Sequence, residues 1–462
     1  MKRKPKPSQP NNSVQQERKP QTTTPIQSEE QVRFNARNRQ RKQLLPKAVA
    51  LGVLSGLLAV AFRYCLDLGE EWRGEWLRVA HHYKELGLAA VLLVSVLATL
   101  FAAWIVARFA PEASGSGIPH LKAVLQGHRQ FHWLRVLVVK FISGLVAIST
   151  GLALGREGPT VQMGGAVGHA LGQDNTGGEG EKRILVAAGG GAGLAAAFNA
   201  PLSGLMFVLE ELQENCATVV FFVAALACLA ADMICRQLLG QSPIFPLAIS
   251  KAPSLYLLPV IIPLGAVCGV VGVIFNQSLL FGQRLVSLPM VGRFGYWVFW
   301  GLVIGLVGWW RPEMLGGGQH LAKHIIAGQT LPQTTIVMFF VVRFFLTIGS
   351  YSSGVAGGIF APVLVLGALL GLGMGELAMQ WFPQIPDDKL SFAVVGMAAL
   401  FTGVVRAPLT GMVLVIEMTA NYELVLPLFL ACFVALTVAD GLHNLPIYEA
   451  LLERDLMRSK GK

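Results

Sequence analysis

The strongest constraint in the sequence is an internal repeat. Gly155-Arg156-Glu157-Gly158-Pro159 and Gly358-Ile359-Phe360-Ala361-Pro362 share the form Gly-x-x-x-Pro. In both copies, counted from the proline, a serine stands ten residues before it, a glycine eight before, and glycines five, nine and thirteen after. The chain therefore contains two homologous halves, and its fold must use the same local structure twice.

A second pair of motifs follows the first. Asn199-Ala200-Pro201-Leu202-Ser203-Gly204 leads to Glu210, and Arg406-Ala407-Pro408-Leu409-Thr410-Gly411 leads to Glu417, each glutamate nine residues past its proline. The two motifs are separated by 42 residues in one half and 46 in the other, counted between prolines. The repeat thus extends well beyond one short motif.

Apolar runs cover most of both halves. The chain is 53% apolar and 14% charged, whereas soluble domains carry about 25% charged residues. Several runs are shorter than the roughly 20 residues of a full span and contain Gly or Pro, as broken or re-entrant helices do. We predict an all-α polytopic membrane protein with transmembrane halves at 45–240 and 250–440 and a final helix end with a short C-terminus at 441–462.

The net charge of +10 is concentrated near the N-terminus. Residues 1–47 carry twelve Lys and Arg against three Glu, which leaves nine of the ten charges there. We interpret the basic, Pro-, Gln-, Ser- and Thr-rich segment 1–44 as a disordered cytoplasmic tail close to anionic lipid, and not as a nucleic-acid-binding segment. The first 45 residues contain no apolar stretch typical of a signal peptide.

Cysteine and histidine spacing predicts no metal site and no disulfide framework, because no CxxC pair occurs. We expect no cofactor, and we expect the cysteines to be core residues. The six cysteines are Cys65, Cys216, Cys228, Cys235, Cys268 and Cys432.

The two Gly-x-x-x-Pro motifs predict helix N-termini. A proline in the first turn loses nothing by lacking an amide, and two such N-termini, one from each half, are expected to face one another. Their free amides and partial positive charge form an anion site without a fixed cation, which would bind the anion too tightly to release it. The glycines spaced four apart after each proline indicate faces for close helix packing.

With these motifs in hand, the chain resembles the CLC chloride channels and transporters. The family's three signatures stand here as Gly115-Ser116-Gly117-Ile118-Pro119 and the two Gly-x-x-x-Pro motifs, in the same order. The resemblance implies about 18 helices in two inverted-topology repeats, a homodimer with one pore per subunit, and both termini in the cytoplasm. The short stretch after Glu417 lacks the regulatory domains of eukaryotic members, which points to a bacterial inner membrane.

The resemblance also implies the chloride ligands. The hydroxyls of Ser116 and Tyr448 would donate to a central chloride, together with the amides of Ile359 and Phe360. Amides around Gly155, Arg156 and Glu157 would line an external site. From sequence alone, the serine reads equally as a helix N-cap and the tyrosine as an interfacial residue.

Glu157 is the expected gate. A carboxylate at the mouth of an amide-lined site competes with chloride when it is ionised and leaves when it is protonated, so one group couples proton and chloride traffic. The alternative is a structural ion pair with the neighbouring Arg156.

Glu211 aligns with the family's internal proton-transfer glutamate, which channels usually replace with valine. Its presence favours a chloride/proton antiporter. The alternative for Glu210 and Glu211 is a hydrated helix end, and Glu417 is expected to have a structural role.

Two other transport functions stay open, and one enzymatic function is disfavoured. A passive CLC chloride channel and a fluoride/proton antiporter are the alternatives within the family. An intramembrane serine hydrolase using Ser116 and His120 is disfavoured because no orienting acid follows and the repeat would be unexplained, so we expect no enzyme. His120 replaces the acid that often follows the first signature; we expect it to be solvated, or else to tune the pH dependence.

Overall fold

The computed structural model describes residues 25–173, 178–213, 218–245, 258–286, 290–328, 331–381 and 389–460. Across these residues the chain forms seventeen α-helices and no sheet, which confirms the predicted all-α class. The first eight helices are α1 Pro25–His82, α2 Lys84–Phe109, α3 Ile118–Leu125, α4 Trp133–Ser149, α5 Glu157–Leu171, α6 Gly178–Phe198, α7 Pro201–Phe207 and α8 Thr218–Leu239. The others are α9 Leu258–Leu285, α10 Met290–Trp310, α11 Gln319–Ile326, α12 Gln333–Ser352, α13 Phe360–Trp381, α14 Lys389–Val405, α15 Pro408–Thr419, α16 Val425–Gly441 and α17 Ile447–Lys460.

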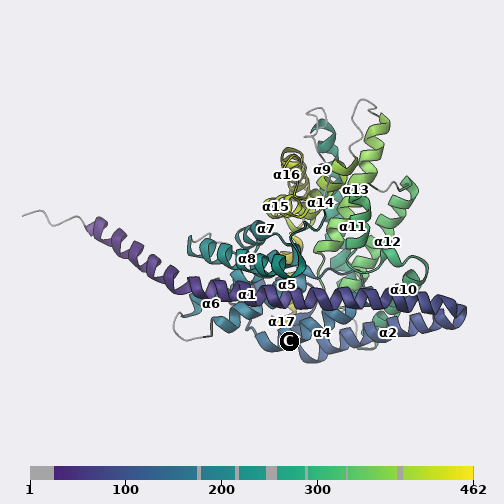
Figure 1. The fold of residues 1–462 in the computed structure, drawn as a ribbon, viewed down its shortest axis with the longest axis horizontal. Coiled ribbons are helices and arrows are strands. Elements are labelled where there is room, and N and C mark those ends of the chain that lie inside the picture. Colours follow the sequence, from purple (N-terminus) through teal and green to yellow (C-terminus); the bar gives the residue numbers. More distant parts are fainter. Residues whose placement is uncertain are drawn as a thin grey trace, which may run out of the picture.

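The element order repeats as the sequence motifs do. Two long helices, a 3₁₀ turn (Pro111–Ala113 or Pro312–Met314), a short helix and five further helices make up α1–α8 and again α9–α16. Most of the second half lies in the upper part of Figure 1, and α17 returns to the first half, where it packs against α3. At 1.5 Å per residue, the eight-residue α3 and α11 span only about 12 Å; each starts next to a buried glycine, Gly117 or Gly318, and is followed by exposed residues.

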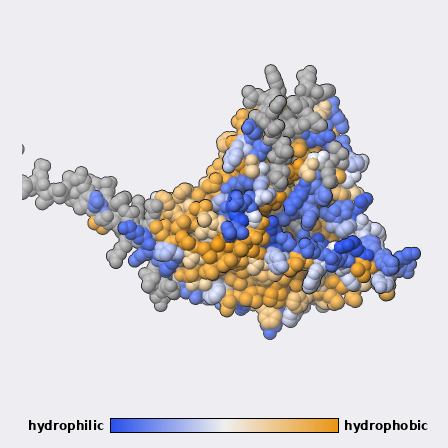
Figure 2. All heavy atoms as spheres, viewed as in Figure 1, coloured by the Kyte–Doolittle hydropathy of each residue, from blue (hydrophilic) through white to orange (hydrophobic). Residues whose placement is uncertain are grey.

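The outer surface is suited to lipid. Within the described residues, six helices are long and apolar enough to cross a membrane, among them α2, α9 and α13. On α2, Leu93, Leu97, Phe101 and Trp104 are 44–59% exposed along one stripe, the pattern of a helix face in contact with acyl chains. Figure 2 shows apolar surface over the left and lower parts of the molecule.

The basic N-terminal segment is partly helical. Helix α1 begins at Pro25, inside the segment 1–44 that the composition predicted to be disordered. Residues 1–24 lie outside the described part of the chain, and for them disorder stays a prediction.

Two pairs of helices pack at backbone contact through glycine. A Cβ at Gly164 of α5 would overlap the carbonyl oxygen of Gly189 on α6, and the reverse also holds. Gly367 of α13 and Gly396 of α14 make the same reciprocal contact in the second half. The predicted small-residue faces are confirmed. They pack α5, the helix that begins at the first Gly-x-x-x-Pro motif, against α6, and α13, the helix that begins at the second, against α14.

A buried cation supports the loop before each short helix. The Nζ of Lys140 on α4 donates to the carbonyl oxygens of Ala113 and Gly115 at 2.9 and 2.7 Å. Arg343 on α12 donates to those of Met314 and Gly316 at 2.8 and 3.0 Å. Lys140 and Arg343 both stand nineteen residues before the motif proline, so the two cations are repeat partners.

The two repeat glutamates cap helices of the opposite half. Glu210 accepts from the amides of Leu409 and Thr410 at the start of α15, at 3.1 and 2.7 Å. Glu417 accepts from the amides of Leu202 and Ser203 at the start of α7, at 3.0 and 2.8 Å. Each carboxylate thus satisfies N–H groups that have no partner within their own helix.

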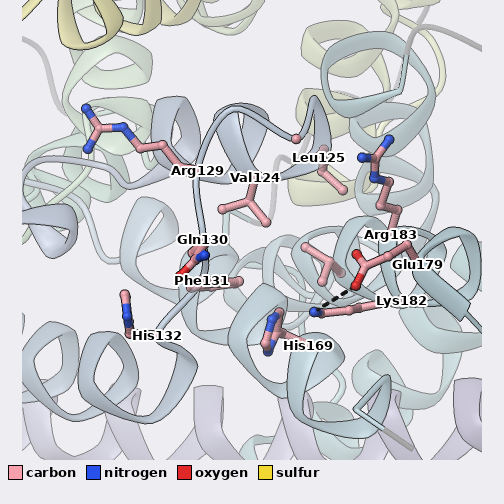
Figure 3. A pocket seen from close by; sticks show the side chains of 12 residues that line it. Val124, Leu125, Arg129, Gln130, Phe131, His132, His169, Glu179, Lys182 and Arg183 are labelled. Atoms are coloured by element: carbon pink, nitrogen blue, oxygen red, sulfur yellow. Dashed lines mark hydrogen bonds and ion pairs between the residues drawn. The ribbon is translucent and has the colours of Figure 1, made fainter. Parts of the chain in front are cut away.

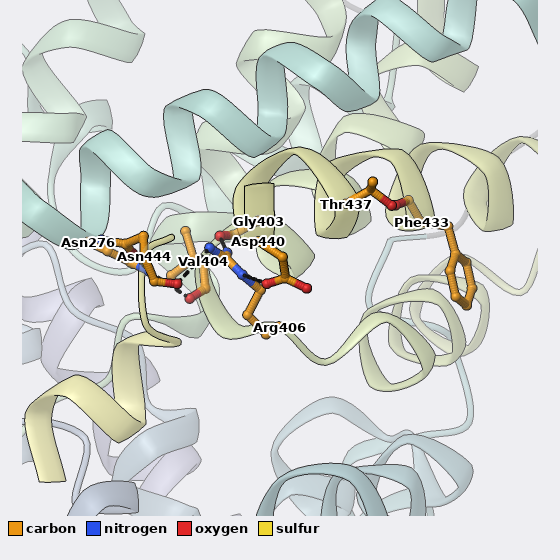
Figure 4. Close-up of polar contacts among 8 residues, drawn as sticks. All are labelled: Asn276, Gly403, Val404, Arg406, Phe433, Thr437, Asp440 and Asn444. Carbon is orange, nitrogen blue, oxygen red and sulfur yellow. Dashed lines mark hydrogen bonds and ion pairs between the residues drawn. The ribbon is translucent and has the colours of Figure 1, made fainter. Parts of the chain in front are cut away.

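The turns before α7 and α15 are held differently. Their repeat partners Asn199 and Arg406 have positive φ values of 53° and 69°. In the second half, Arg406 Nε donates to Asp440 at 3.0 Å and its Nη1 to the carbonyl of Gly403 (Figure 4). In the first half the cation comes from α8, where Arg236 donates to the carbonyl of Asn199 at 3.1 Å.

Candidate functional site

The loops before α5 and α13 meet at the centre of the protein. The Gly155 amide donates to the Gly358 carbonyl at 2.7 Å, and the Gly358 amide donates back at 2.8 Å. Since α5 begins at Glu157 and α13 at Phe360, this antiparallel bridge brings both helix N-termini to one place. The two N-termini therefore face one another as the repeat predicted.

A third loop joins them at the start of α3. Gly115 bonds to the second-half loop through both its amide and its carbonyl, each at 2.9 Å. A Cβ on Gly158 would lie 2.8 Å from the Cα of Ser116 and 2.9 Å from that of Gly358. Three helix N-termini thus converge, with Ser116 between them.

Ser116 is fully buried. Its Oγ lies 3.4 Å from the amide of Ile118, as in a weak N-cap, and 3.4 Å from the hydroxyl of Tyr351. Tyr351 was not predicted from the sequence. The signal available for it was a tyrosine within the hydroxyl-rich end of an apolar run, between Ser350 and Ser352.

Tyr448 is fully buried at the start of α17. Its ring stacks on that of Phe360 with 6.1 Å between the centroids, and its hydroxyl is in electrostatic range of Glu157, Glu211 and Tyr351. Among the described residues this hydroxyl has no hydrogen-bond partner. Burying an unpaired hydroxyl costs about 1–3 kcal/mol, so the group is suited to donate to a bound ion.

Glu157 is also fully buried. Its Oε1 accepts from Gln319 Nε2 at 3.3 Å, and its carboxyl group faces the backbone N–H of Ala361 at the start of α13. The side chain of Arg156 points to Asp67 at 3.9 Å. The carboxyl group of Glu157 therefore lies where an anion between the two N-termini would lie, and Gln319 is a contact that the sequence motifs did not predict.

Glu211 lies in a π-helical segment, Val208–Leu212, that continues α7. It is 9% exposed, so the interpretation as a hydrated helix end does not apply to it. Its Oε1 accepts from Nζ of Lys122 at 2.9 Å. Lys122 was also missed, because the two residues are 89 positions apart.

His120 corrects an expectation. It is 7% exposed and not solvated, because α3 is enclosed by other helices along most of its length. Its Nδ1 lies 3.2 Å from Nε2 of Gln162, and its ring meets Phe131 edge-on.

A basic depression of about 450 Å³ lies apart from these residues. It is formed where α3, α4, α5 and α6 end or begin, and Arg129, His132, Lys182 and Arg183 line it (Figure 3). The 3.5 Å ion pair of Lys182 with Glu179 leaves the lining net positive. None of the residues predicted to bind chloride or transfer protons lines it.

The described cysteines and acids offer no metal site. Within the described ranges, five cysteines are free and no group of three His, Cys, Asp or Glu side chains is gathered. Cys216 lies outside those ranges.

Comparison with known proteins gives a consistent result. Residues 98–440 match the family model described as "Voltage gated chloride channel". The chain is 40% identical over 435 residues to a Vibrio cholerae protein named "H(+)/Cl(-) exchange transporter ClcA", covering 92% of each. A Salmonella paratyphi B protein of the same name is 38% identical over 439 residues, covering 92% of this chain and 91% of that protein.

The fold has solved counterparts as well. A slow cyanobacterial Cl⁻/H⁺ antiporter superposes with a TM-score of 0.87 at 34% identity, covering 90% of this chain and 99% of that one. A CLC-type fluoride/proton antiporter superposes with a TM-score of 0.72 at 19% identity, which is a likeness of fold alone.

Proposed function

The chain belongs to the voltage-gated chloride channel (CLC) family, and from that premise we propose that it exchanges chloride for protons across a membrane. The observation that carries the proposal is the meeting of three helix N-termini around two buried hydroxyls and one buried carboxyl group. An amide- and hydroxyl-lined site binds a halide with partial charges only, so the ion is held and still released.

The central chloride is bound by the hydroxyls of Ser116 and Tyr448 and by the amides of Ile359 and Phe360. The unpaired Tyr448 hydroxyl and the contact of Ser116 with the loop junction support this assignment. An external chloride is bound by amides around Gly155, Arg156 and Glu157.

Glu157 is the gate. Its position between the starts of α5 and α13 supports a competition in which the ionised carboxylate excludes chloride and the protonated one withdraws. The side chain of Glu157 then alternates between binding a proton and occupying the anion site, and this alternation couples proton flux to chloride flux.

Glu211 passes protons between Glu157 and the cytoplasm. Its burial supports the role because a carboxylate enclosed in protein exchanges protons only with neighbours that reach it. The nearness of both Glu211 and Glu157 to the buried Tyr448 supports placing the two acids around the same ion site.

The remaining assignments follow the family. The protein is a homodimer in a bacterial inner membrane, with both termini in the cytoplasm and one pore in each subunit. No nucleic acid and no cofactor take part.

The test is flux from chloride-loaded liposomes with a proton readout. The outward chloride gradient should drive protons inward, and the lumen should acidify until a protonophore is added. Chloride efflux without proton uptake would identify a passive channel and overturn the antiport proposal. A faster proton-coupled flux with fluoride in place of chloride would favour the fluoride antiporter.

A further inference from the structure

Lys122 is a charged residue inside the protein core. Its side chain is 10% exposed, and its Nζ lies 2.9 Å from Oε1 of Glu211 and 3.7 Å from Oε1 of Glu449. The side chain of Glu211 is 6% exposed, whereas that of Glu449 is 49% exposed. A buried ammonium is costly unless it is paired, so the contact with Glu211 is the one that stabilises it in this position.

The second half of the protein provides an internal control. Lys323 stands eleven residues after Pro312, as Lys122 stands eleven after Pro111. Lys323 is exposed on α11. The residue after the capping Glu417 is Met418, where the first half has Glu211 after Glu210. The repeat retains the lysine but not the buried ion pair, so the architecture that the two halves share occurs in the second half without the pair.

Lys122 also joins the elements around the anion site. It lies on α3, which begins two residues after Ser116, and it reaches Glu449, which follows Tyr448 on α17. Through Glu211 it contacts the segment that continues α7. The ammonium of Lys122 therefore contacts Glu211 from the helix that follows Ser116, and it also reaches the helix that carries Tyr448.

The charges around Glu211 decide what Lys122 does. Glu211 is faced by Lys122 from α3, by Glu449 and Tyr448 from α17, and by Glu210 from its own segment. Lys122 is the cation in this set, while burial and the two neighbouring acids all favour the neutral carboxyl. A proton-transfer group must be able to lose its proton as well as hold it.

We propose that Lys122 is a positioning residue for proton transfer: it holds Glu211 in place and makes its ionised form accessible between proton transfers. This rests on the proposed antiport. Without the ammonium, Glu211 stays protonated in its apolar surroundings and passes protons slowly, while the chloride ligands are unchanged.

The experiment compares four liposome preparations: the wild type, Lys122→Met, Lys122→Arg and, as the matched control, Lys323→Met. We expect Lys122→Met to lower proton flux by roughly tenfold or more, with chloride flux within about twofold of wild type. Its remaining proton flux should require a higher pH than that of the wild type. Lys122→Arg should restore coupling, and Lys323→Met should match the wild type.

A purely structural lysine gives a different result. It would lower chloride and proton flux together and leave the pH profile of proton flux unmoved, which would overturn the proposal. The double variant Lys122→Met/Glu211→Gln is the second check. If Lys122 acts through Glu211, the double variant should match Glu211→Gln alone in both fluxes, and a further loss would contradict this.

The failures of the two proposals are distinguishable. Chloride flux without proton flux in the wild type overturns the antiport and the role of Lys122 with it. A coupled wild type that Glu211→Gln uncouples, together with a Lys122→Met variant that behaves like the wild type, overturns the role of Lys122 alone.

Discussion

The two halves of the protein share their supports and differ in their reactive groups. Lys140 and Arg343 hold equivalent loops, and Glu210 and Glu417 cap equivalent helices. At the ion site, however, Glu157 corresponds to Phe360. This difference separates the residues that stabilise the framework of the site from the residues that take part in transport.

The same division appears beside the capping glutamates. Glu211 has Met418 as its counterpart, and the buried Lys122 has the exposed Lys323. Where the halves agree, we expect substitutions to change stability. Where they differ, we expect substitutions of the charged first-half residue to change transport.

The strongest test substitutes Glu157 and its counterpart Phe360. Glu157→Ala should lower proton flux by roughly a hundredfold or more, because no carboxylate remains to alternate between proton and anion site. Chloride flux should persist and become insensitive to pH, as measured in liposomes. Phe360→Ala keeps its backbone amide and should mainly cost stability, about 3–5 kcal/mol. Intact proton coupling in Glu157→Ala would break the comparison.

The next test separates the neighbours Glu211 and Glu210. Glu211→Gln should leave chloride flux and lower proton flux by roughly a hundredfold. Glu210→Gln should keep the coupling ratio, because that carboxylate is engaged at the start of α15. Paired chloride and proton measurements on both variants check this, and equal uncoupling would refute the division of roles.

A third test concerns the two buried cations. Lys140→Met and Arg343→Met each remove a buried charged donor to two loop carbonyls, which should cost about 2–4 kcal/mol of unfolding free energy. Denaturant titration in detergent measures it, with Lys323→Met as the exposed control. Losses that differ widely between Lys140 and Arg343 would show that the supports are not equivalent.

The smallest expected effect is at the reciprocal caps. Glu210→Ala and Glu417→Ala should each cost about 1–2 kcal/mol, because each removes the acceptor for two helix N-terminal amides. The same titration applies, with the exposed Glu313→Ala as control. A cost confined to one of the two caps would argue against a symmetric framework.

The sequence predicted the framework where the repeat made it visible. Spacing alone indicated the facing N-termini at Gly155 and Gly358 and the packing of glycines such as Gly164. The same spacing also pairs Lys140 with Arg343, since both stand nineteen residues before the motif proline. Local patterns of this kind can be recognised in the sequence because the backbone conformation at each position requires the glycine or proline found there.

Contacts between distant segments could not be predicted in the same way. Lys122 meets Glu211 and Ser116 meets Tyr351 only after the helices pack. His120 was misjudged for the same reason, because a polar side chain on a short helix reads as exposed until the surrounding helices are known. The roles of Ser116, Tyr448 and Glu211 came from resemblance and not from spacing.

The capping of α7 by Glu417 and of α15 by Glu210, each from the opposite half, also affects how the protein folds during its synthesis. When the first half enters the membrane during synthesis, the start of α7 has no carboxylate at its amides until Glu417 has been translated more than two hundred residues later. The first half is therefore an incomplete folding unit that must wait for the second, and we expect the chain to become compact and resistant to proteolysis only near the end of its synthesis.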